Sequence, residues 1–276
     1  MTDTTIARTG PDHRAAFRAA TFGDVLRSEW TKLRSVRSTF WALTVTVVLG
    51  IGLGAVVSAA AARGYAKSSV SGKLSWDPTA VSLDGIGIAT LAIAVLGVLC
   101  VSSEYSSGMI RTSLIAVPKR GRVLAAKSLV FAAVTSSWAR PPASRRSSRA
   151  RPSSAATPPH AALGDPGVAW AVMGAGLALT ALAVLSVAAG TVLRHPAAAI
   201  ACMIAVLFVL PAIAQALPDS WRNPVTEFWP TQAGGQLASV HHSAHTLQPW
   251  PGFGVMCLFT AIVYAIAWML LDRRDA

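Results

Sequence analysis

Residues 86–103, IGIATLAIAVLGVLCVSS, form an uncharged apolar run of 18 residues that decides the fold class. About 20 helical residues cross the roughly 30 Å of hydrocarbon in a membrane, so this run has the character of a membrane span. Four more runs without Asp, Glu, Lys or Arg lie at residues 39–62, 168–193, 196–217 and 253–271. Buried helices of soluble proteins usually keep a polar face. The sequence therefore predicts an all-α integral membrane protein.

The composition supports this class, and the charges indicate an orientation. Hydrophobic residues make up 53% of the chain and charged residues 13%, against about 45–50% and about 25% in soluble domains. Seven Lys or Arg residues precede residue 39, and Arg273 and Arg274 follow the last run. Basic residues favour the cytoplasmic side, so we expect a multi-pass protein of the cell membrane with both termini in the cytoplasm. Orientation explains most of the net charge of +12, and we expect no nucleic-acid partner.

Residues 21–37, TFGDVLRSEWTKLRSVR, predict an amphipathic helix in the cytoplasmic interface, with its apolar face among the acyl chains. Thr21 and Asp24 have the spacing of a capping box. Glu29 falls within the apolar face, where two interpretations remain open. It pairs with Lys32 three residues later, or it bonds to the rest of the protein or to a partner. The apolar residues of this face are Phe22, Val25, Leu26, Trp30, Leu33 and Val36.

Residues 104–127, EYSSGMIRTSLIAVPKRGRVLAAK, follow the run at 86–103 directly and predict a cytoplasmic loop. The loop has an acidic residue at the end of the span, then a short segment compatible with a helix that has an apolar side. Pro118, Lys119, Arg120 and Lys127 follow. This layout suits the docking of a soluble motor protein. A solvated basic loop that only sets the topology is the alternative.

Together with EWTKLRSVRSTFW at residues 29–41, this loop resembles the corresponding segments of type-2 ABC transporter permeases of the actinobacterial type. The resemblance implies a cytoplasmic N-terminus with an elbow helix over 1–37 and a six-span permease domain over 38–276. It also implies a dimer with a second copy or a paralogue, and a coupling helix that enters a groove on a separate ATPase. The coupling positions that it implies are Glu104, Gly108, Met109, Ile110, Arg111, Leu114, Pro118 and Arg120, and those of the elbow are Glu29, Trp30, Lys32 and Leu33.

The expected function is therefore that of the permease subunit of an ATP-driven exporter, which forms the translocation pathway. We do not expect the chain to be an enzyme, because it lacks the G-x-x-x-x-G-K-[ST] pattern of a phosphate-binding loop. The five runs contain no acidic residue, which argues against an ion-driven transporter. The alternative function is a membrane scaffold or immunity-type protein that has the same fold but does not transport.

Cysteine and histidine patterns indicate neither a cofactor nor a metal. The three cysteines lie singly within apolar runs, as packing residues do. A histidine cluster near residue 241 lacks the glutamate of an H-E-x-x-H motif, and a polar external loop explains it. The residues concerned are Cys100, Cys202, Cys257, His241, His242 and His245.

A third span is expected near residues 123–138, but the chain there is too short and too basic. These 16 residues include Lys127, and five arginines lie between 140 and 151. Inserting the five arginines into the membrane would cost about 12–17 kcal/mol of free energy, whereas inserting the apolar residues of 123–138 would contribute only about 2–4 kcal/mol. We favour two compensating frameshifts as the origin of residues 136–160. A native, disordered external loop after a short helix is the alternative.

Overall fold

The computed structural model describes residues 21–35, 86–110, 112, 120–138, 167–239 and 246–273, together with a few isolated positions between 52 and 64. Every regular element in these ranges is a helix. The predicted span at 39–62 lies outside the described residues, except for those isolated positions. Residues 139–160 of the anomalous segment also lie outside them.

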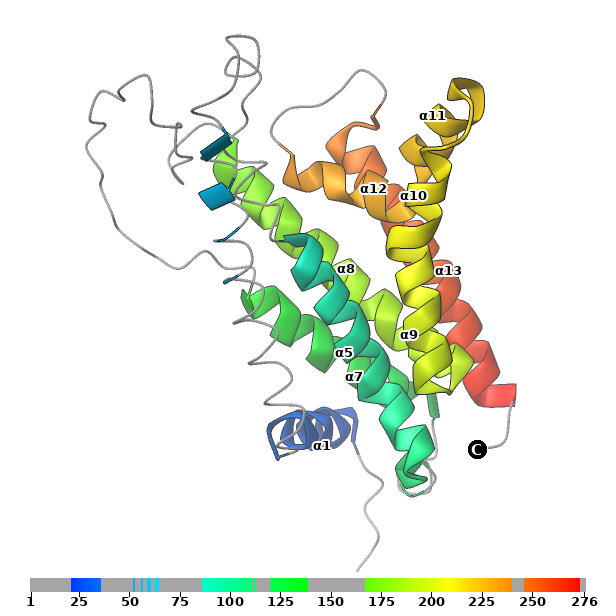
Figure 1. Ribbon diagram of the computed structural model, residues 1–276. Helices are drawn as coiled ribbons and strands as arrows, with labels where there is room; N and C mark the ends of the chain where they lie inside the picture. Colours follow the sequence, from blue (N-terminus) through cyan, green and yellow to red (C-terminus); the bar gives the residue numbers. More distant parts are fainter. Residues whose placement is uncertain are drawn as a thin grey trace, which may run out of the picture.

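Figure 1 shows the arrangement of the helices. The longest ones run roughly along one direction, and the short ones lie across their ends. In chain order the elements are α1 (Phe22–Ser35), α5 (Ile86–Ser106), α7 (Arg120–Trp138), α8 (Val168–Leu193), α9 (Pro196–Ile204), the π-helix η1 (Ala205–Val209), α10 (Leu210–Ala214), α11 (Asp219–Phe228), α12 (Pro230–Gly235), the 3-10 helix η2 (Gln236–Ala238) and α13 (Pro249–Arg273).

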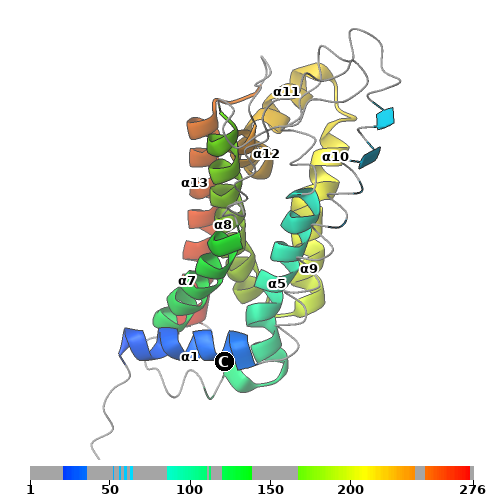
Figure 2. The ribbon, with the colours of Figure 1, turned by 90° about the vertical axis from the view of Figure 1, so that its left-hand side faces the viewer.

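The bundle has two ends with different contents (Figures 1 and 2). At one end α1 lies across the long helices, beside the end of α5, the connection from α8 to α9 and the C-terminus. We call this the α1 end. The short helices α11 and α12 lie at the opposite end, where α8 and α13 begin, and we call this the α12 end. The α1 end therefore gathers the segments that the charge pattern places in the cytoplasm.

Helix α8 is central, because it packs against α5, α7 and α13. The contact with α5 is close. A Cβ atom at Gly97 would lie 2.6 Å from Cβ of Ser186, which is too short for two side chains. Small residues allow helix backbones to approach in this way, as is common in membrane helix bundles. The core around this contact includes Ile93, Val98, Phe131, Leu182 and Val187.

Four helices are long and apolar enough to cross a membrane: residues 89–106, Val168–Leu193, Pro196–Ala214 and Pro249–Arg273. They correspond to four of the five predicted spans. The run at 168–193 matches α8 residue for residue. The last span is longer than predicted at both ends, and the run at 196–217 ends as a helix at Ala214. The all-α class is therefore confirmed for the described residues, together with four candidate spans.

Helix α7 occupies the place of the predicted third span and ends at Trp138, the predicted boundary. It has 19 residues, against 26 in α8, so at 1.5 Å per residue it is about 10 Å shorter. It carries Arg120, Arg122 and Lys127, and it is not among the four candidate spans. Its start lies three residues before the predicted one.

Helix α1 begins with the predicted capping box. The Thr21 N–H donates to Asp24 Oδ2 at 2.9 Å, and the Asp24 N–H donates to Thr21 Oγ1 at 3.3 Å. These bonds satisfy two N–H groups that have no partner within the helix. The apolar face is divided. Val25 is buried against Val123 and Ala126 of α7, whereas Trp30 is exposed. The expectation that the whole face lies among acyl chains is therefore wrong for Val25.

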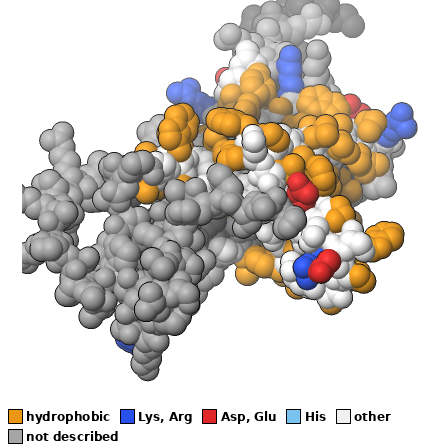
Figure 3. Space-filling model, turned by 90° about the horizontal axis from the view of Figure 1, so that it is seen from above, with side chains coloured by type: hydrophobic (Ala, Val, Ile, Leu, Met, Phe, Trp, Pro, Cys, Tyr) orange, Lys and Arg blue, Asp and Glu red, His pale blue; other side chains and the backbone are white. Residues whose placement is uncertain are grey.

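Tryptophans gather at the α12 end. Trp170 begins α8, Trp221 lies on α11 and Trp250 begins α13, and all three side chains are exposed. Figure 3, seen from this end, shows many hydrophobic side chains and few charged ones on the described surface. Exposed indoles are typical of a membrane-water boundary. The tryptophans therefore favour a position of the α12 end near such a boundary.

Candidate functional site

The candidate site is a charge cluster at the α1 end that joins three helices. It consists of Glu29 and Lys32 on α1, Glu104 near the end of α5, and Lys127 on α7. The Lys127 ammonium donates to Glu29 Oε2 at 2.7 Å and to Glu104 Oε1 at 2.9 Å. The Lys32 ammonium donates to Glu29 Oε1 at 2.8 Å and to Glu104 Oε1 at 3.2 Å. Each ammonium group thus bridges both carboxylates.

Three members of the cluster are buried, and Lys32 is half-buried. Lys127 and Glu29 are each 4% exposed and Glu104 is 7% exposed. A buried charge without a partner is strongly destabilising, whereas paired charges recover most of the cost of desolvation. Two carboxylates face two ammonium groups, so the cluster is formally neutral as a whole. Because its members come from α1, α5 and α7, neutrality requires all three helices to be in place.

Glu29 is the acid that the cluster holds most firmly. Burial raises the pKa of this carboxyl, but the nearby Lys127 and Lys32 ammonium groups outweigh that effect and lower the pKa below 4.5, its ordinary value. Both of its oxygens accept hydrogen bonds. Glu104 accepts both ammonium groups through Oε1, and its Oε2 is buried without a hydrogen-bond partner among the described residues. Glu104 is therefore held on one side only.

Both interpretations of Glu29 are correct at once. It pairs with Lys32 three residues later, and it also bonds to α7 through Lys127. Glu104, which the resemblance places among the coupling residues, lies inside the bundle in this same cluster. From the sequence, Lys127 is expected to belong to the basic docking loop and to weaken the third span, and its pairing with Glu29 and Glu104 is not predicted. The signal that could have revealed its role is a lone lysine in an apolar segment, matched by a lone glutamate in an apolar face.

The chain turns sharply just after the cluster. Gly108 has a φ of 72°, a left-handed conformation that favours glycine and commonly ends helices. Its N–H donates to the Tyr105 carbonyl at 3.3 Å. The next two side chains point in different directions, because Met109 is 50% exposed and Ile110 only 6%. The turn therefore presents Met109 to the surroundings and is anchored by Ile110.

Arg120 begins α7 and also holds the bundle together. Its Nη1 donates to the Leu271 carbonyl near the end of α13 at 3.4 Å. A cationic side chain is favourable at a helix C-terminus, where carbonyl groups lack partners within the helix. The remaining predicted coupling residues, Arg111, Leu114 and Pro118, lie outside the described residues. Of the elbow residues, Leu33 is half-buried like Lys32.

The charged groups of this site are suited to holding helices together rather than to catalysis. Its four charged groups can fix the relative positions of three helices, and Met109 offers a contact directly beside them. In the described ranges, no group of three or more His, Cys, Asp or Glu side chains is placed to hold a metal ion. The three histidines near residue 241 lie outside these ranges. Comparisons with protein-family models and with curated proteins found no match.

Proposed function

We propose that this chain is the permease subunit of an ATP-driven exporter of the type-2 ABC kind, and that a separate ATPase docks at its α1 end. The observation that carries the proposal is the charge cluster. It ties the end of α5, which leads into the exposed turn at Met109, to α1 and to α7. A force applied at this turn therefore reaches three helices through buried ionic contacts.

The packing of the bundle supports transmission beyond the cluster. Gly108 lies one helical turn after Glu104, so the turn and the cluster move together if α5 moves as a rigid body. Helix α8 packs on α5, α7 and α13 at once, and Arg120 connects the start of α7 to the end of α13. Movement at the turn would shift the candidate spans relative to one another. In an exporter, such a shift opens a pathway between this permease and a second one.

The test is co-purification with an ABC ATPase encoded next to this gene. We expect Met109→Asp to abolish the association, because it places a charge on the apolar contact. The side chain is half exposed, so the variant should keep wild-type thermal stability. Trp221→Asp is the matched control, since this residue is exposed at the opposite end, and it should retain the ATPase.

A stronger variant replaces residues 108–114 with a Gly/Ser linker, which removes the whole predicted coupling helix. Membrane insertion should persist, because the candidate spans are untouched. If the ATPase still co-purifies with the linker variant in wild-type amounts, the docking assignment is wrong.

A membrane scaffold that binds the motor without transport is the second candidate. The short α7 favours it, because a bundle that lacks a complete third span has an incomplete wall. Both functions require association with the ATPase. Only the permease predicts that Met109 also affects the rate of ATP hydrolysis by the complex in lipid vesicles. A complex whose ATPase rate equals that of the isolated motor would favour the scaffold.

A further inference from the structure

The helix that runs from α9 through η1 to α10 contains an irregular turn with a clear chemical cause. Residues Ala205–Val209 are π-helical, and the Leu210 N–H bonds to the Ala205 carbonyl, five residues earlier. The next residue is Pro211, which has no N–H to donate. In a regular α-helix the Leu210 N–H would donate to the Val206 carbonyl, but here it donates to Ala205. In a continued π-helix the donor would be the N–H of residue 211, which proline lacks. The Val206 carbonyl therefore has neither of these backbone donors.

Trp229 supplies the missing donor. Its indole Nε1–H donates to the Val206 carbonyl at 3.0 Å. Trp229 is the single extended residue between α11 and α12, and it precedes Pro230, which disfavours a helical conformation at this position. A tertiary hydrogen bond therefore fastens the junction of the two short helices to the middle of a candidate span.

The two halves of this span are held differently. Helix α9 packs against α5 and α8. Helix α10 contacts α11, which follows it in the chain, and buries Pro211 and Ala214. Its Leu210 and Ile213 side chains are exposed, as are Phe208 and Val209 within the turn. A π-turn followed by proline is a common site of helix bending, because its hydrogen-bond ladder is already interrupted. Helix α10 can therefore change its angle to α9 at low cost.

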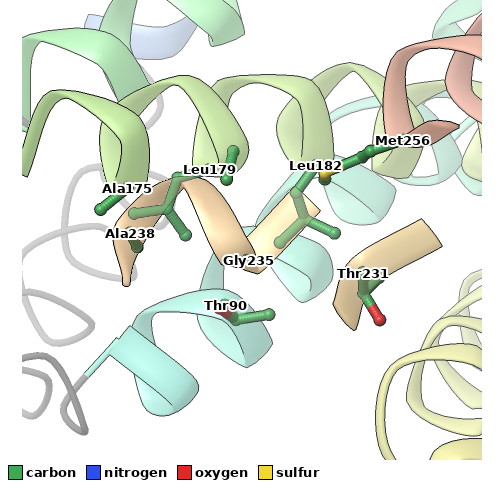
Figure 4. A pocket seen from close by; sticks show the side chains of 9 residues that line it. Thr90, Ala175, Leu179, Leu182, Thr231, Gly235, Ala238 and Met256 are labelled. Atoms are coloured by element: carbon green, nitrogen blue, oxygen red, sulfur yellow. The ribbon is translucent and has the colours of Figure 1, made fainter. Parts of the chain in front are cut away.

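The Trp229 junction also leads directly into the wall of a cavity. This cavity, of about 80 Å³, lies between α5, α8, α12 and α13, and Thr231, Gly235 and Ala238 form one side of it. Figure 4 shows Leu179 and Leu182 of α8 across from these residues. Thr231 follows Trp229 by two residues. The indole bond therefore sets the position of α10 relative to the cavity wall.

We propose that the π-turn before Pro211 is a hinge and that the Trp229 indole is the latch that fixes its angle. While the bond is intact, α10 is held against the junction of α11 and α12. When the bond breaks, α10 swings about the turn and separates from the cavity wall. Pro211 is essential to the latch, because it has no N–H and so leaves the Trp229 indole as the hydrogen-bond donor of the Val206 carbonyl. The proposal rests on this geometry alone and does not require that the chain exports a substrate.

Hydrogen–deuterium exchange of the full chain in lipid nanodiscs tests the latch. We expect Trp229→Phe, which keeps an aromatic ring but loses the donor, to accelerate exchange of residues 205–217 about threefold to tenfold, as fits the loss of one hydrogen bond. Exchange of α8 should not change, which would show that the fold is intact. Trp221→Phe is the control, because this indole is exposed on α11.

The double variant Pro211→Ala with Trp229→Phe provides the decisive comparison. Alanine restores an N–H at residue 211, so the Val206 carbonyl gains a backbone donor in either helical register. We therefore expect the double variant to exchange residues 205–217 at the wild-type rate. The proposal is overturned if Trp229→Phe leaves this exchange unchanged, or if it accelerates exchange equally in the Pro211→Ala background. If Trp229→Phe does not fold, the double variant should fold, and its failure to do so would also overturn the latch.

Discussion

The α1 end and the α12 end of the bundle are held together by different physical means. At the α1 end, three buried charged side chains and the half-buried Lys32 meet, and each ammonium group bridges two carboxylates. At the α12 end, backbones approach closely at glycines, and one neutral hydrogen bond from Trp229 joins distant segments. The first end therefore depends on charge in addition to close packing, and the second mainly on shape.

This difference predicts different sensitivities. Removing one member of a buried charge cluster leaves another charge without compensation, and the cost is large. Adding a methyl group at a close backbone contact forces helices apart, and the cost depends on how far they can move. The α1 end should therefore respond strongly to loss of charge, and the α12 end to added volume.

The largest expected effect is that of Lys127→Met. Methionine fills a similar volume, but it leaves Glu29 and Glu104 buried with only the half-buried Lys32 as a partner. We expect a loss of about 3–5 kcal/mol in the free energy of unfolding, measured by equilibrium unfolding in mixed micelles. Arg122→Met on the same helix is the control. This residue is exposed, so the change should stay within about 0.5 kcal/mol.

A triple variant sharpens the role of charge. Replacing Glu29 and Glu104 with Leu together with Lys127→Met removes the buried acids and their central base at once. Apolar replacement of buried ions together with their partners is often neutral or stabilising, and the remaining Lys32 is half-buried, so its charge is still in contact with water. We expect the triple variant to be more stable than Lys127→Met alone. If it is equally unstable, packing rather than charge holds the α1 end.

At the α12 end, Gly174→Ala tests the importance of shape. A Cβ atom at this position would collide with the Leu237 carbonyl, and a backbone atom cannot rotate away as a side chain can. We expect a loss of about 1–3 kcal/mol in the free energy of unfolding. Gly254→Ala on α13 is the control, because no atom lies within 4 Å of the added carbon. If Gly174→Ala has the stability of the wild type, η2 moves away from the added methyl group without cost.

A smaller effect is expected at the start of α1. Thr21→Ala removes the hydroxyl that accepts the Asp24 N–H, and loss of an N-cap costs about 0.5–2 kcal/mol. The charge cluster lies two turns further along the helix and should keep α1 attached. Circular dichroism of the melt and protease cleavage within residues 21–35 would measure the effect. Ser28→Ala, an exposed change inside the helix, should show no loss.

The last prediction concerns the pH dependence that Glu29 contributes. Its pKa in the folded chain lies below the ordinary value of 4.5, so its stabilising contribution is complete above that value and is lost as pH falls through the lowered pKa. Glu29→Gln cannot ionise. The difference in melting temperature between wild type and this variant should stay constant above pH 4.5 and close below it. A difference that closes near neutral pH would contradict the lowered pKa.

Most helices could be predicted from the sequence because their causes are local. The uncharged run at 168–193 gives α8 with the same bounds, and the spacing of Thr21 and Asp24 gives the start of α1. The charge cluster could not be predicted, because its bonds join residues 98 and 23 positions apart. No periodicity within one helix reveals which distant charge it will meet. The role of Trp229 was missed for the same reason.

By itself, the sequence determined the helical class, the positions of four candidate spans and the short, basic character of the segment around α7. These properties follow from hydrophobic length, charge and capping, which act within a few residues of the chain. Only the tertiary structure decided that Lys127 lies buried between Glu29 and Glu104, and that Trp229 bonds to the carbonyl that Pro211 leaves without a donor. Such pairings depend on how the helices pack, because a buried charge or carbonyl is stable only beside a partner that another segment brings to it.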